Sequence, residues 1–194
     1  MGALRPSFFV GWAGLGPFFV FKEKNMKNPA HFVARAAIIA ALYAVLTHLQ
    51  NLLLPGSTTW MIQMRLSEML CVLAFFTPAA IPGLTLGCLV FNLTFAAALP
   101  LDFVVGSLAT FLAAWAMWRL RNVTVKGWPL PGLLMPAVTN ALLVGWELSV
   151  YIGGGFAINA VYVALGEAAV LLIFGSALYF TICRRHLDGK LFAE

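Results

Sequence analysis

Long apolar runs alternate with short breaks along most of this chain. The breaks contain Pro, Gly or polar residues, for example Pro55-Gly56, Leu99-Pro100 and Gly153-Gly154-Gly155. A membrane-spanning helix needs about 20 mostly apolar residues, and a helix satisfies its own backbone hydrogen bonds in lipid. The pattern therefore predicts an all-α integral membrane protein, a bundle of six transmembrane helices near 31–50, 60–76, 79–98, 102–120, 130–151 and 157–183.

Composition agrees with this pattern. Of the 194 residues, 62% are hydrophobic and 10% are charged, whereas soluble domains carry roughly 25% charged residues. This excludes a disordered chain, a nucleic-acid-binding module and an ordinary soluble enzyme. The three cysteines (Cys71, Cys88 and Cys183) stand far apart in apolar runs, which is typical of small core residues.

Lysine and arginine orient the predicted bundle. They gather before the first helix, at 119–126 and after Cys183, whereas loops 51–59, 99–101 and 152–156 contain neither residue. Basic residues mark the cytoplasmic side of a membrane protein. With six spans all three basic clusters lie on one side, so both termini are predicted to be cytoplasmic. The net charge of +5 is then mainly a topology signal, and no nucleic-acid partner is expected.

The first 25 residues are predicted to be an extension, with a single membrane domain over 26–194. Phe8 to Phe21 is an uncharged run of 14 residues, which is short for a span. No small-residue cleavage site follows it. Met26 would be a natural start for a six-helix protein, and a seventh span is the alternative.

Five charged residues lie in the long apolar stretches 36–118 and 127–183: Arg65, Glu68, Asp102, Glu147 and Glu167. The predicted topology places all of them in the outer half or at the midplane of the bilayer. One arginine faces four carboxylates, and a buried carboxylate is costly unless it is paired, protonated or ligand-bound. A ligand with a cationic group or several N–H donors would resolve this excess. The structural alternatives are an Arg65–Glu68 pair that locks the bundle and Asp102 as a helix N-terminal charge.

Polar residues of the same half complete the candidate site. Aromatic residues there, Trp60, Trp146, Tyr151 and Tyr162, could stack on a flat ring or belong to the membrane interface. The predicted substrate-binding residues are Gln63, Arg65, Glu68, Asn92, Asp102, Asn140, Glu147, Asn159, Tyr162 and Glu167.

Alanines repeat every four residues in the first helix. One row is Ala36, Ala40 and Ala44, and the other is Ala37 and Ala41. Such spacing lets helices approach closely in lipid. The rows predict either packing inside the bundle or a docking face for a second membrane protein.

Motifs for chemistry or energy supply are missing from the sequence. It contains no GxxxxGK[ST] phosphate loop, no GxSxG and no HExxH, and its three histidines have no metal-ligand spacing. We expect no catalytic residue, cofactor or metal. A binding site without an energy source indicates a partner that supplies the energy.

Several motifs resemble those of a known family. Residues 30–185 are similar to the substrate-binding S components of energy-coupling factor (ECF) transporters, and most similar to the QueT family. The resemblance is carried by Gln63-Met-Arg65-Leu-Ser-Glu68, by Gly87 to Asn92, by Leu101-Asp102 with Gly106-Ser107, by Asn140 with Glu147, and by Gly166-Glu167.

This resemblance implies a prokaryotic plasma-membrane protein with six helices and cytoplasmic termini. It implies uptake of a queuosine precursor, such as 7-aminomethyl-7-deazaguanine or its 7-cyano relative. It further implies docking, through the first-helix alanines, on a transmembrane coupling subunit that works with two ATPase subunits. Loop 51–59 would cap the site.

Three other functions fit the same residues. The chain could bind a different vitamin such as cobalamin, or act as a stand-alone secondary transporter with Glu147 or Glu167 as a proton relay. A membrane enzyme that uses the acidic residues is the third alternative.

Overall fold

The computed structural model describes residues 29–58 and 62–187. The predicted extension 1–25, Trp60 and the end of loop 51–59 lie outside these residues. The elements are α1 (Pro29–Leu53), the 3₁₀ helix η1 (Leu66–Phe75), α2 (Ala80–Thr94), α3 (Asp102–Arg119), α4 (Leu130–Leu133), α5 (Met135–Tyr151), α6 (Phe156–Val170), the π-helical turn η2 (Leu171–Gly175) and α7 (Ser176–Arg184).

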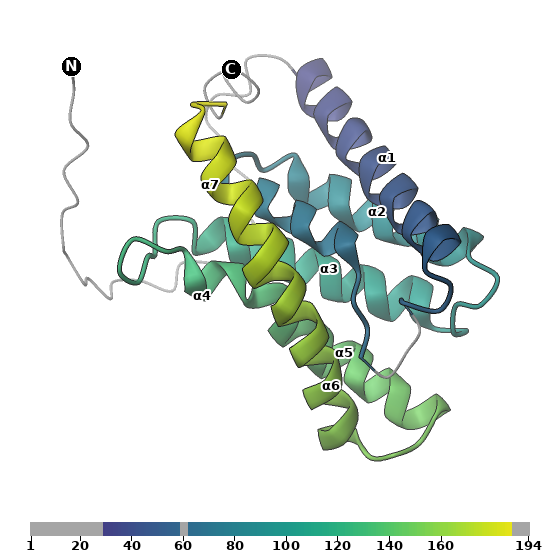
Figure 1. Ribbon diagram of the computed structural model, residues 1–194. Coiled ribbons are helices and arrows are strands. Elements are labelled where there is room, and N and C mark those ends of the chain that lie inside the picture. Colours follow the sequence, from purple (N-terminus) through teal and green to yellow (C-terminus); the bar gives the residue numbers. More distant parts are fainter. Residues whose placement is uncertain (1–28, 59–61, 188–194) are drawn as a thin grey trace, which may run out of the picture.

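Helices account for all regular structure in the described part of the chain, and apart from 60–76 each predicted segment corresponds to helical structure with bounds that differ by up to four residues. Three helical stretches there are long and apolar enough to cross a membrane: Pro29–Leu53, Leu130–Tyr151 and Phe156–Arg184. The last stretch is a single rod made of α6, η2 and α7 (Figure 1). Every predicted break between segments lies at a loop or turn.

The second segment differs from the prediction. Residues 60–76 were expected to form a membrane-spanning α-helix, but Arg65 is extended (φ −91°, ψ 105°) and a 3₁₀ helix of ten residues follows. Such a helix rises about 2.0 Å per residue, so η1 covers roughly 20 Å, less than the ~30 Å hydrocarbon core. Irregular backbone at membrane depth is tolerated where protein buries it, and both Gln63 and Arg65 are buried.

The connections divide between two ends of the molecule in Figure 1. Loop 95–101 between α2 and α3 and loop 152–155 between α5 and α6 lie toward the right and the bottom of the view. Loop 120–129 and the end of α7 lie toward the left and the top. The loops without Lys or Arg are therefore separated from the loop that carries Arg121 and Lys126.

Glycines allow neighbouring helices to pack at short range. A Cβ on Gly87 of α2 would lie 2.8 Å from the Ala40 carbonyl oxygen of α1, and one on Gly145 of α5 would lie 2.8 Å from the Ala160 Cα of α6. Side chains there would push these helices apart, so the α1–α2 and α5–α6 pairs depend on small residues.

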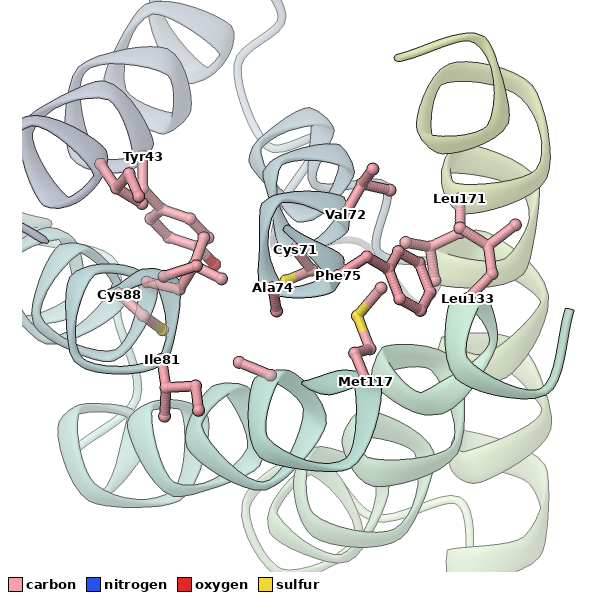
Figure 2. Close-up of a cluster of buried hydrophobic side chains, with 14 of the residues drawn as sticks. Tyr43, Cys71, Val72, Ala74, Phe75, Ile81, Cys88, Met117, Leu133 and Leu171 are labelled. Carbon is pink, nitrogen blue, oxygen red and sulfur yellow. The ribbon is translucent and has the colours of Figure 1, made fainter. Parts of the chain in front are cut away.

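The apolar core surrounds η1. Cys71, Val72 and Phe75 of η1 point toward side chains from the surrounding helices, among them Met117 of α3 and Leu171 (Figure 2). Tyr43 of α1 also points inward, toward the space between α2 and η1. The core thus places the start of η1, which carries Glu68, in the middle of the bundle.

Candidate functional site

A buried polar cluster, here defined as Arg65, Glu68, Asp102, Glu147 and Glu167, occupies the interior of the bundle. All five are less than 9% exposed. They come from the irregular segment before η1, from η1 itself, and from α3, α5 and α6. Sequence reasoning predicted these five residues in the outer half or at the midplane of the bilayer. The structure places them close enough to act on one another.

Glu68 has partners for both of its carboxylate oxygens. The Tyr43 hydroxyl donates to Oε1 at 2.5 Å, and the Cys71 thiol donates to Oε2 at 3.1 Å. All three residues are at most 1% exposed. Two donors from α1 and η1 therefore fix the orientation of this carboxylate.

Arg65 is positioned through its neighbours in the chain. Gln50 of α1 accepts a hydrogen bond from the Leu66 amide at 2.8 Å and donates one to the Met64 carbonyl. It thus holds the backbone on both sides of Arg65. The guanidinium carbon lies 6.0 Å from the centroid of the Phe91 ring, which is at the limit of a cation–π contact.

These contacts belong to a polar stripe on α1 that the sequence reasoning missed. Tyr43, Thr47 and Gln50 are all buried. Thr47 donates to the Ser67 hydroxyl at 2.7 Å, so each residue of the stripe contacts the segment 64–68. The spacing i, i+4, i+7 is the signal that could have revealed this face.

Asp102 and Asn92 join α2 to α3. The Asn92 amide donates to the Asp102 backbone carbonyl at 2.7 Å, and Gly106 leaves room for it. One Asp102 carboxylate oxygen accepts the Leu99 amide at 3.0 Å. Asp102 therefore has the helix-terminal role that the sequence left open, and that role uses one of its two oxygens.

Glu147 is the least satisfied carboxylate. It is fully buried, and neither of its oxygens has a hydrogen-bond donor in the described structure. Its nearest charged groups are Asp102, which repels it, and Arg65, which attracts it.

Glu167 is repelled by Glu68 and attracted by Arg65. The Asn140 side chain of α5 is placed to donate to it. Its Oε2 has no partner in the described structure. Arg65 is therefore the positive charge shared by four carboxylates, and no salt bridge shorter than 4.0 Å forms among the described members of the cluster.

Gln63, Asn159 and Tyr162, three other predicted site residues, have different surroundings. Gln63 is buried, with its backbone carbonyl close to Gly166 of α6. Asn159 donates to the Gly153 carbonyl at 2.8 Å and holds the 152–155 turn. Tyr162 is half-buried. Trp146 and Tyr151 are 50% and 42% exposed, as expected for residues at the membrane interface.

The two alanine rows of α1 have different environments. Ala36 and Ala44 are buried and Ala40 is half-buried, and the Ala36 and Ala40 carbonyls face Gly83 and Gly87 of α2. This row therefore packs inside the bundle, which was one of the two readings of the sequence. Ala37 and Ala41 are exposed.

The matches to known proteins identify the family. The family model described as "QueT transporter" matches residues 33–184, which is most of the chain. The chain belongs to the QueT transporter family. This confirms the resemblance inferred from the sequence motifs, and all ten candidate site residues lie within the matched range. Family membership and the three long apolar helices together make the chain a membrane protein.

A curated relative belongs to the same family. The queuosine precursor transporter QueT of Lactococcus lactis subsp. cremoris (strain MG1363) is 36% identical over 86 residues, which is 44% of this chain and 48% of that protein. The match thus spans about half the length of that relative. No solved structure matches the chain.

Proposed function

We propose that this QueT-family chain is the substrate-binding S subunit of an ECF-type importer for a queuosine precursor of the 7-deazaguanine class. The family name and the Lactococcus relative support a queuosine precursor as the substrate. In this proposal the chain captures the ligand from outside the cell, and separate subunits supply the ATP hydrolysis. It functions as a transporter subunit rather than an enzyme.

The observation that carries this proposal is the unsatisfied Glu147 in the buried polar cluster. A buried carboxylate with no donor costs several kcal/mol, and selection removes such a cost unless the group has a use. A deazaguanine offers an N–H and NH₂ edge that matches a carboxylate, and its aminomethyl form adds an ammonium. The ligand would thus provide the donors that the protein does not.

The remaining candidate residues would complete the site. Asn140 and Arg65 would donate to ring acceptors, and Glu167 would accept from the base edge. Asn92, Gln63, Asn159 and Tyr162 would shape the wall and the outer rim.

The proposed assembly has six spans with both termini in the cytoplasm of a prokaryotic cell. A transmembrane coupling subunit and two ATPase subunits would complete it. The orientation follows from the basic residues near 119–126 and 184–190. The exposed row Ala37 and Ala41 is the part of the small-residue pattern that remains available for docking.

Calorimetry of the detergent-purified chain tests this function. The chain alone should bind 7-aminomethyl-7-deazaguanine or its 7-cyano relative with sub-micromolar affinity and without ATP. A panel with cobalamin and other vitamins is the control for specificity. Sub-micromolar binding of a vitamin and none of either deazaguanine would contradict the proposed substrate.

A further inference from the structure

The carboxylates of the buried polar cluster differ in the hydrogen-bond donors that the protein supplies to them. Both oxygens of Glu68 are hydrogen-bonded within the protein. Glu167 is attracted by Arg65 and lies beside Asn140. Glu147 has no donor for either oxygen in the described structure, although it is fully buried. The most available carboxylate is therefore Glu147.

Asp102 is the acidic partner of Glu147. It projects from the first turn of α3, and the Leu99 amide holds one of its oxygens. α3 packs against α5, and the two carboxylates are close enough to repel each other. Two buried carboxylates at this range cannot both remain charged without a cation, so they either share a proton or bind a positive group.

The other elements around Glu147 supply one more relevant charge. Arg65 attracts Glu147 and Asp102, but it also serves Glu68 and Glu167, so it does not neutralise the pair. α6, which packs against α5, carries Tyr162 and Glu167. Glu167 interacts with Glu68 and Arg65. α4 carries no titratable side chain.

From this arrangement we propose that Asp102 and Glu147 form a subsite for a primary ammonium group of the ligand, and that Glu147 determines specificity for it. The inference rests on the proposed function. Glu68, in contrast, is a positioning residue, because the Tyr43 hydroxyl and the Cys71 thiol already donate hydrogen bonds to its carboxylate. The two roles predict different consequences of neutralising the two glutamates.

Proton exchange accompanies binding at this subsite. In this proposal the empty Asp102–Glu147 pair shares one proton, because two buried carboxylates that face each other do not both stay charged without a cation. An alkyl-ammonium, which is charged at neutral pH, replaces that proton and donates N–H bonds to both carboxylates. The displaced proton goes to the solvent, so binding of the amine releases about one proton. A nitrile carries no positive charge and leaves the shared proton in place.

Calorimetry in buffers of different ionisation enthalpy measures this proton directly. The full-length chain in detergent is titrated at pH 7 with 7-aminomethyl-7-deazaguanine and with the 7-cyano analogue. The expected result is release of about one proton for the amine and none for the nitrile. Glu147→Gln should abolish the release and weaken the amine roughly 10- to 100-fold more than the nitrile, because hydrogen bonds to charged groups contribute about 1.5–3 kcal/mol.

Three further variants define the comparison. Asp102→Asn should also weaken the amine more than the nitrile, which guards against a folding defect specific to Glu147→Gln. Glu68→Gln should weaken both ligands alike and keep the release. Ser149→Ala on the same helix, where the hydroxyl bonds to the Trp146 carbonyl, should leave both affinities unchanged. Thermal unfolding checks that each variant is folded.

The outcomes separate the two proposals. Binding of the amine without proton release, or an equal loss of both ligands in Glu147→Gln, would overturn the ammonium subsite and leave the transporter function standing. Proton release that persists in Glu147→Gln would overturn it as well. If neither deazaguanine binds, the proposed function itself fails, and the subsite with it.

Discussion

Gln50 is a neutral side chain that fixes the backbone on both sides of the charged Arg65. Its amide contacts the Leu66 N–H and the Met64 carbonyl, so the residue between them, Arg65, is held in an extended conformation. Asn51, the next residue, bonds instead to Thr58 and to the Thr47 carbonyl. Adjacent amides of α1 thus support two different parts of the connection to η1.

Replacing Gln50 with alanine should therefore weaken ligand binding. The change leaves the Leu66 amide and the Met64 carbonyl without their partner, at a cost of about 1–3 kcal/mol for each buried group left unsatisfied, and it frees the backbone beside Arg65. Leu49→Ala, at a neighbouring α1 position that is 47% exposed, is the control and should keep nearly wild-type affinity. Equal affinity losses in the two variants, measured by calorimetry, would show that Gln50 has no special relation to Arg65.

The charged residues of the site were predictable from sequence and their partners were not. Five charges in otherwise apolar segments can be recognised without a structure, because burying them is costly. Tyr43 and Gln50 are common polar residues in an apolar helix. Only their helical spacing indicates that they lie on the same face. Whether a carboxylate receives hydrogen bonds from the protein depends on tertiary contacts. The sequence therefore could not show that Glu68 is hydrogen-bonded and that Glu147 is not.

At the scale of elements, α1 presents two chemically equal alanine rows. The sequence could not decide which row faces inward, because both have the same four-residue spacing. The decision lies in α2, where Gly83 and Gly87 are also four apart and receive the backbone of Ala36 and Ala40. The adjacent row, Ala37 and Ala41, remains exposed.

Tryptophan substitutions in the two rows should have different effects. Ala41→Trp adds bulk to an exposed position, so the purified chain should stay folded and bind ligand, while uptake by the complete transporter is lost. Ala40→Trp should instead lower the unfolding temperature, because the α1–α2 contact leaves no room and overpacking typically costs 1–3 kcal/mol. Normal uptake by Ala41→Trp would exclude this row as the docking face.

The second helix was the element that sequence reasoning placed least well. Its residues are apolar nearly throughout, so no polar period distinguishes a 3₁₀ helix from an α-helix. A 3₁₀ helix of ten residues is uncommonly long, and it is stabilised here by core contacts on several sides (Figure 2). Helix propensity therefore does not predict this element, because tertiary packing stabilises it.

At the scale of the whole molecule, the bundle surrounds a cluster of one basic and four acidic side chains. The breaks between helices were predictable from the pattern of apolar runs and loops. The prediction that charged residues of separate helices gather depended on the orientation that Lys and Arg indicate. We interpret the buried polar cluster as a ligand site in which the ligand supplies the hydrogen-bond donors that Glu147 lacks.

A structure of the purified chain with bound 7-aminomethyl-7-deazaguanine would test this account most directly. The account predicts that the ligand lies within hydrogen-bond distance, about 3 Å, of Glu147 and Arg65, with Glu68 still bonded to Tyr43. A ligand bound elsewhere in the bundle, with the Glu147 carboxylate still unpartnered, would contradict it.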